Sequence, residues 1–211
     1  MSKHSKHQSS APQVNIGIST EDRAEIAGEL SKVLADSYTL YLMTHNFHWN
    51  VTGPLFNTLH NMFMDQYSEE WTALDDIAER IRALGEFAPQ SASAFGNLTS
   101  ISDGHPDKSA QEMLQDLIRD HGTVLKTIRG ALEASDEAGD EAPLRDHVDH
   151  RQLLGQADRV LRQRQRIAEH DDLHALGQAR EQRREDVGFR LHAEWGVVVL
   201  IEHDAVEADI L

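Results

Sequence analysis

The chain has 211 residues, no cysteine and a formal net charge of −16. Disulfides and thiolate metal sites are therefore excluded, and the acidic balance argues against a nucleic-acid-binding body and for a surface that attracts cations. Because no apolar run reaches the roughly 20 residues of a membrane span, and no apolar signal segment follows Met1, we expect a cytoplasmic protein with no membrane partner.

Two helices are predicted after a flexible polar tail, residues 1–16. Ser19 offers an N-cap, and apolar residues at three- and four-residue steps predict a helix to about residue 50, where Gly53 and Pro54 break it. A second helix should run from about residue 57 to Gly85. Its apolar stripe is Leu59, Phe63, Tyr67, Trp71, Leu74, Ala78 and Ile81.

A long connection separates these helices from a third one. Residues 86–107 are rich in Ser, Gly, Ala and Pro, which predicts a crossover with a short helix. The third long helix is expected over about residues 108–135, with Met113, Leu117, His121, Val124, Ile128 and Leu132 on one face. Long helices with one crossover are typical of an all-α, ferritin-like four-helix bundle.

The last third of the chain is atypical. All five lysines lie at or before Lys126, whereas ten of the fifteen arginines lie at or after Arg145. A loose stripe over 144–168 is compatible with the fourth helix, so we predict one domain over 17–168 and a tail of unknown fold over 169–211. Within that tail, 180–184 is a basic run and 197–201 a β-like segment. Either this member has replaced its fourth helix, or the gene is read in another frame there.

Two histidines and two carboxylates are the candidate metal ligands: His48, His60, Asp75 and Glu79. Imidazole and carboxylate together suit iron, manganese or zinc. If one helix carries both His60 and Asp75, the two are roughly 22 Å apart at 1.5 Å rise per residue. Metal–ligand bonds are only about 2 Å long. These residues are therefore two unrelated half-sites, or a second chain completes the site.

The residues around these ligands resemble the Dps family, the DNA-binding proteins from starved cells, which are ferritin-like cages of twelve subunits. The resemblance covers roughly residues 20–142. It rests on His48-Trp49-Asn50, Gly53, Phe56, Leu59-His60, Phe63, Tyr67, Asp75-x-x-x-Glu79-Arg80, residues 81–85 and the acidic loop 135–141.

The resemblance implies a ferroxidase centre between two-fold-related subunits of a dodecameric hollow shell. His48 and His60 of one chain and Asp75 and Glu79 of the other would bind Fe(II). Oxidation to Fe(III), preferably by hydrogen peroxide rather than dioxygen, would store ferric mineral and protect DNA. The resemblance also suggests that Trp49 takes up stray oxidising equivalents.

Some family features are altered or weak in this chain. Where many members have an acid four residues after the second histidine, this chain has Met64, with Asp65 displaced about 100° around the helix. We therefore expect one firm iron site and a weak second one at Asp65. Asp136 and Asp140 are either a solvated loop or the lining of a pore through which iron enters.

DNA binding has little support in the sequence, since the N-terminal tail offers only Lys3 and Lys6. Twelve such tails could act together through avidity, and the binding would weaken with salt. Two alternatives to a ferroxidase remain: a non-catalytic DNA-compacting protein, and a bundle that fails to assemble if the C-terminal sequence is a frameshift product.

Overall fold

A computed structural model of the chain describes residues 14–105, 107–140, 155–168 and 178. Every regular element in these residues is a helix: α1 (Thr20–Asn50), α2 (Phe56–Ala83), α3 (Ala92–Leu98), α4 (Ala110–Glu137) and helix 155–168. The chain divides into two compact units, Met1–Arg166 and Ile167–Leu211, and the contacts below belong to the first. The predicted β-like segment 197–201 and basic run 180–184 lie outside the described residues.

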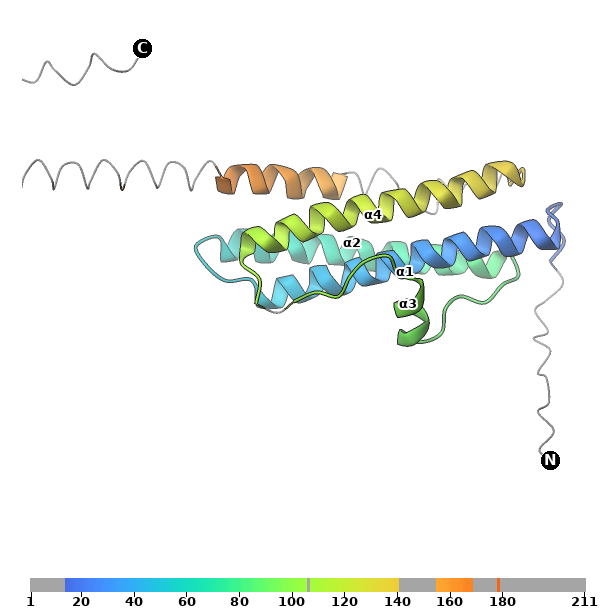
Figure 1. Ribbon diagram of the computed structural model, residues 1–211, viewed down its shortest axis with the longest axis horizontal. Coiled ribbons are helices and arrows are strands. Elements are labelled where there is room, and N and C mark those ends of the chain that lie inside the picture. Colours follow the sequence, from blue (N-terminus) through green and yellow to red (C-terminus); the bar gives the residue numbers. More distant parts are fainter. Residues whose placement is uncertain (1–13, 106, 141–154, 169–177, 179–211) are drawn as a thin grey trace, which may run out of the picture. The chain divides into compact units, whose positions relative to one another are not determined.

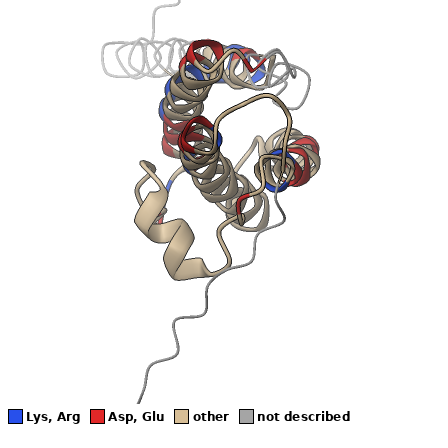
Figure 2. Cartoon of the chain, turned by 90° about the vertical axis from the view of Figure 1, so that its right-hand side faces the viewer, with Lys and Arg blue, Asp and Glu red and all other residues tan. Residues whose placement is uncertain are grey.

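The long helices pack as a ferritin-like bundle. Helix α1 contacts both α2 and α4, and the short α3 lies beside α1, outside the long helices (Figures 1 and 2). Residues of helix 155–168 reach α2: Gln66 donates to the backbone carbonyl of Gln156 at 3.3 Å, and Arg159 pairs with Glu69 at 2.6 Å. The predicted all-α bundle is confirmed, and the range 144–168, left open for a fourth helix, contains a helix over 155–168. Residues 144–154 lie outside the described part, and the domain boundaries stay predictions.

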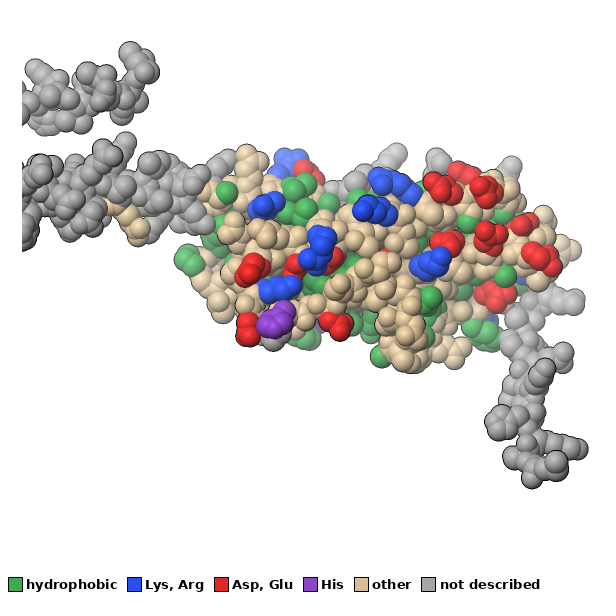
Figure 3. All heavy atoms as spheres, in the orientation of Figure 1, with side chains coloured by type: hydrophobic (Ala, Val, Ile, Leu, Met, Phe, Trp, Pro, Cys, Tyr) green, Lys and Arg blue, Asp and Glu red, His purple; other side chains and the backbone are tan. Residues whose placement is uncertain are grey.

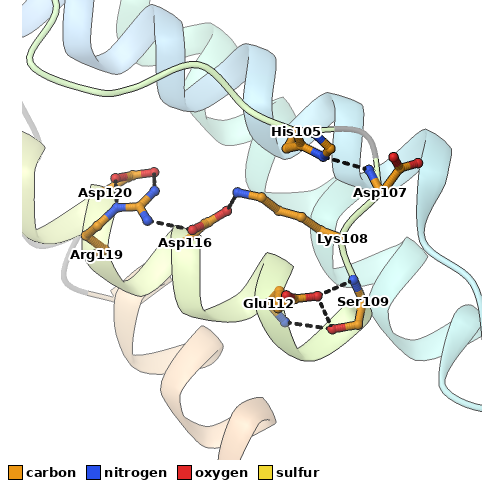
Figure 4. A network of polar contacts seen from close by, with 8 residues as sticks. All are labelled: His105, Asp107, Lys108, Ser109, Glu112, Asp116, Arg119 and Asp120. Atoms are coloured by element: carbon orange, nitrogen blue, oxygen red, sulfur yellow. Dashed lines mark hydrogen bonds and ion pairs between the residues drawn. The ribbon is translucent and has the colours of Figure 1, made fainter.

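Side-chain caps fix where the helices begin. The Ser19 hydroxyl accepts a hydrogen bond from the Asp22 backbone at the start of α1. At the start of α4, Ser109 and Glu112 form a reciprocal capping box, which Figure 4 shows beside the Lys108–Asp116–Arg119 ion pairs. Such caps satisfy backbone N–H groups that have no partner inside the helix.

We expect Ser109→Ala to lower the free energy of unfolding by about 1 kcal/mol, because the cap of α4 loses its acceptor. Chemical denaturation monitored by circular dichroism would measure the change. Ser93→Ala is the matched control, since Ser93 is exposed and lies inside the short α3. An equal loss in both variants would contradict a specific capping role.

The core is made by one face of each long helix. Its largest side chains with less than 2% exposure are Phe47, Phe63, Ile26, Leu30, Leu40, Leu59, Ile77, Ile81, Leu84, Met113, Leu114 and Leu117. Within one chain, the apolar stripe predicted on α2 is not buried along its whole length. Trp71 is 60% exposed and Tyr67 is half-buried, whereas Gln66 and Glu70 are buried instead. The face of α2 that is buried in the bundle is therefore rotated around the helix axis from the face that carries the apolar stripe.

Asp36 ties the crossover to the bundle. Its buried carboxylate accepts hydrogen bonds from the Thr99 hydroxyl at 2.9 Å, the Ser100 backbone at 2.5 Å and the Thr127 hydroxyl at 2.6 Å. A buried carboxylate is tolerated only with partners of this kind. This contact holds the segment after α3 against α1 and α4.

The charges lie mainly on the outer surface. Acidic and basic residues both occur on the long helices (Figure 2), and acidic side chains gather over the C-terminal end of α4 (Figure 3). Among the described helices, none combines the length and apolarity that crossing a membrane requires.

Candidate metal centre

The turn between α1 and α2 brings His48 and His60 together. His48 lies in the last turn of α1 and His60 in the first turns of α2. Their rings stack with centroids 3.7 Å apart and an interplanar angle of 21°. Gly53, at a φ of 100°, supplies the left-handed backbone that lets the chain reverse within so few residues.

The two histidines are held by reciprocal hydrogen bonds. Nδ1 of His48 lies 2.8 Å from the carbonyl oxygen of His60, and Nδ1 of His60 lies 2.9 Å from that of His48. A carbonyl only accepts, so each Nδ1 carries the proton and each neutral ring keeps its lone pair on Nε2. This is the tautomer that a metal ion requires, fixed by a backbone partner as in known metal sites.

Asp75 and Glu79 form a second pair toward the other end of α2. Both are exposed and one helical turn apart. The continuous helix Phe56–Ala83 confirms that His60 and Asp75 share one helix, so they are roughly 22 Å apart. Among the described residues, no three or more His, Asp or Glu side chains cluster to hold a metal ion. One chain therefore brings together each pair, and the two pairs stay apart.

Two large apolar side chains, Met64 and Trp71, are exposed on the part of α2 between these pairs. Asp75 is about 60° and Met64 about 40° around the helix from His60, so all three lie on one side. Met64 is 40% and Trp71 60% exposed on this stretch. Asp75 borders a surface hollow that Trp71, Tyr38 and Phe95 also line. Large apolar side chains on an exposed helix face mark an interaction surface.

Aromatic rings surround the histidine pair. Tyr67 lies 5.3 Å from His48, centroid to centroid, and stacks on His45 at 4.1 Å. His45 in turn lies 4.2 Å from Trp49, which is 64% exposed. Burial and the neighbouring His48 lower the pKa of His45, so this ring is neutral near pH 7. His45 therefore packs beside the histidine pair.

The two acidic residues predicted for a pore lie in different environments. Asp136 is exposed near the end of α4. The side chain of Asp140 is only 2% exposed and forms an ion pair with the buried Arg80. Asp140 is therefore held by an ion pair, whereas Asp136 faces solvent, and a pore lined by these residues stays a prediction. Asp65, the predicted weak second iron ligand, is exposed on α2.

The structure also contains a buried cluster of polar side chains that the sequence pattern did not predict. Gln66, Glu70 and Gln156 are at most 4% exposed, and His121 is fully buried beside them. The spacing of residues along α2 could have indicated this cluster. Residues 59, 63, 66, 70, 74, 77 and 81 follow regular three- and four-residue steps, but two of them are polar and the apolar Tyr67 and Trp71 lie next to them.

Comparisons with known proteins place the chain in a family. The ferritin-like domain family matches residues 27–148. The DNA protection during starvation protein of Brevibacillus brevis is 35% identical over 117 residues, 56% of this chain and 78% of the relative. DpsC from Streptomyces coelicolor has a TM-score of 0.68 at 25% identity, covering 72% of this chain and 91% of that one.

A Vibrio cholerae Dps protein, described as a member of a broad superfamily of ferritin-like diiron-carboxylate proteins, has a TM-score of 0.60 at 25% identity. The match covers 75% of this chain and 94% of that one. The fold and the family match together define a ferritin-like protein, and the chain belongs to the Dps family within that class.

Proposed function

We propose that this protein is a Dps-type ferroxidase of the cytoplasm. It oxidises Fe(II), preferably with hydrogen peroxide, stores ferric mineral inside a cage of twelve subunits and so protects DNA. The observation that carries the proposal is the pair of stacked histidines, each with Nδ1 on a backbone carbonyl and its Nε2 lone pair unused by that bond. On α2, Asp75 lies roughly 22 Å and Glu79 roughly 28 Å from His60, and both carboxylates are exposed.

A two-fold axis completes the centre. Two copies of α2 that cross antiparallel bring His60 to Asp75 of the partner subunit, and each such interface is self-complementary. When residue 60 of one α2 lies opposite residue 75 of the other, the two-fold axis passes between residues 67 and 68 of each helix. Met64 then lies opposite Trp71 of the partner subunit. These two exposed apolar side chains then cover each other, which supports this pairing. Two identical centres result per dimer.

The ligands suit both oxidation states of the substrate. Neutral imidazoles hold Fe(II), and carboxylates favour the harder Fe(III) product. Two Fe(II) ions each give one electron, and hydrogen peroxide takes both electrons and two protons to form two water molecules. Peroxide is then consumed without releasing a hydroxyl radical, provided that both electrons arrive.

Nearby rings offer a source for the second electron when only one iron is bound. Tyr67 contacts both His48 and His45, and the Trp49 ring lies 4.2 Å from that of His45, centroid to centroid. A Tyr or Trp that gives one electron completes the reduction of peroxide inside the protein. We therefore assign Trp49 the role of taking up stray oxidising equivalents.

Met64 limits the second iron site in this proposal. It lies one turn after His60 on the same side of α2, where an acid would reach the centre, whereas Asp65 is rotated by about 100°. We expect Met64→Asp to raise the number of Fe(II) ions bound per centre from one toward two in anaerobic calorimetric titration. Met64→Leu is the control, and an unchanged stoichiometry in Met64→Asp would argue against this explanation.

Anaerobic loading followed by oxidation tests the function directly. Fe(II) is added to the full-length protein, half an equivalent of hydrogen peroxide follows, and ferric absorbance is recorded beside a dioxygen arm. We expect oxidation much faster than in buffer and faster with peroxide, with iron eluting with the protein in gel filtration. Oxidation at the buffer rate would refute the ferroxidase assignment.

DNA compaction is the second candidate, favoured by the name of the Brevibacillus relative. Its proposed contacts, Lys3 and Lys6, lie outside the described residues. A gel shift at low and high salt, with and without residues 1–13, would separate direct binding from protection by iron removal.

Gel filtration tests assembly, since a monomer or open dimer cannot hold a mineral core.

A further inference from the structure

A second polar cluster lies inside the bundle. It comprises residues of α1, α2, α4 and helix 155–168, all at most 4% exposed: Thr44, Gln66, Glu70, His121 and Gln156. Glu70 follows His60 by ten residues along α2, or roughly 15 Å. The cluster is therefore separate from the histidine pair, and the oxidation of iron proposed above makes no use of it.

His121 presents a lone pair to the cluster. Its Nδ1 donates to the carbonyl oxygen of Leu117 at 2.7 Å, so in the neutral ring Nε2 is an acceptor. That Nε2 lies 3.4 Å from Oε1 of Gln156 and 3.9 Å from Oε1 of Glu70. The amide nitrogen of Gln156 donates to Glu69 at 3.0 Å, which keeps its oxygen on the side of His121.

The cluster is rich in acceptors and poor in donors. Both carboxylate oxygens of Glu70 and Oε1 of Gln66 have no hydrogen-bond partner among the described residues. The amide nitrogen of Gln66 is used by the backbone carbonyl of Gln156, and the Thr44 hydroxyl donates to Leu40. Lone pairs that face one another in a buried site destabilise it, unless a cation lies between them.

We propose that this cluster binds one divalent transition-metal ion, such as Zn²⁺ or Fe²⁺. The ligands are Nε2 of His121, the carboxylate of Glu70 and Oε1 of Gln156, with Oε1 of Gln66 completing the set. Two metal–ligand bonds of about 2.1 Å span up to about 4.2 Å, so the separation of 3.9 Å between His121 and Glu70 suits a shared ion.

The surroundings of the two ionisable ligands support a cation. Nδ1 of His121 bonds to a backbone carbonyl, the arrangement that orients a metal-binding imidazole. Glu70 is 4% exposed, and neither of its carboxylate oxygens has a hydrogen-bond partner among the described residues. A bound dication would compensate the carboxylate charge that burial disfavours.

The ion would have a structural role. Its ligands come from α2, α4 and helix 155–168, so it would cross-link the fourth helix to two others. Binding an ion to the folded state alone raises stability. The rival occupant is a proton, which would leave Glu70 neutral and donating to the Thr44 oxygen.

Zn²⁺ binding to the full-length His60→Ala/Asp75→Ala protein tests the proposal, because the inter-subunit centre is disabled there. We expect equilibrium dialysis to find one Zn²⁺ per subunit, Co²⁺ to give a visible absorption band, and Zn²⁺ to raise the melting temperature. Adding Glu70→Gln and His121→Gln should abolish all three. Adding Asp76→Asn and His105→Gln, an exposed pair of the same chemistry, should leave them unchanged.

A complementary measurement uses the protein with an intact inter-subunit centre. There Glu70→Gln/His121→Gln should lose one Zn²⁺ per subunit and keep its Fe(II) oxidation rate, which also shows that it folds. No Zn²⁺ bound to the His60→Ala/Asp75→Ala protein would overturn the proposal in favour of a protonated Glu70. Binding that survives Glu70→Gln/His121→Gln would overturn it as well.

Discussion

Replacing His60 by alanine is expected to slow peroxide-driven oxidation of Fe(II) by on the order of 100-fold or more, since even the outer partners of metal ligands contribute 10–100-fold. The variant removes one of two stacked imidazoles and also the Nδ1–H that donates to the carbonyl of His48. Stopped-flow absorbance of ferric product after anaerobic loading would measure the rate.

The matched control for the carboxylate half is Asp76→Asn. Asp76 is exposed and adjacent to Asp75, but it points about 100° away around α2. Asp75→Ala should slow oxidation as His60→Ala does, whereas Asp76→Asn should keep the rate of the unaltered protein. Equal rates in all three variants would show that iron is oxidised elsewhere.

Asp140→Ala is expected to lower the free energy of unfolding by about 3–5 kcal/mol, the cost of breaking a buried ion pair from one side. Arg80 would keep a guanidinium that is only 8% exposed and has lost its carboxylate partner. Denaturant titration followed by circular dichroism would report the loss, and the variant's oxidation rate in the folded state should change little.

Asp136→Ala separates a structural role from iron uptake. Asp136 is exposed, so its removal should change the free energy of unfolding by less than about 0.5 kcal/mol. If Asp136 attracts iron toward a pore, mineralisation should slow in this variant, with a larger effect at low ionic strength. A stability loss as large as that of Asp140→Ala would contradict the distinction between the two residues.

The elements of the bundle could be predicted from local signals. Ser19, Gly53 and the capping box at Ser109 fix helix ends through backbone chemistry, which depends on a few neighbouring residues. The face that α2 buries could not be predicted from apolarity alone. Trp71 is apolar yet 60% exposed in one chain, where the proposed dimer would cover it, and Glu70 is buried although a carboxylate is charged in water. Both depend on contacts distant in sequence.

The sequence predicted the spacing of the candidate ligands but not the hydrogen bonds that orient them. Spacing along one helix established that His60 and Asp75 cannot share an ion within one chain, and the continuous α2 upholds that argument. The reciprocal hydrogen bonds between His48 and His60 were not foreseen, because they depend on how the turn at Gly53 places two backbone carbonyls. Those bonds fix the tautomer, which no residue pattern encodes.

Whether two chains share each centre can be measured by mixing two inactive variants. His60→Ala and Asp75→Ala chains, co-expressed with different tags and allowed to assemble, form mixed dimers in which one centre has both defects and the other has none. With random pairing, about one quarter of the centres are intact. We therefore expect about a quarter of the activity of the unaltered protein. Mixed assemblies no more active than either variant alone would contradict a centre built by two subunits.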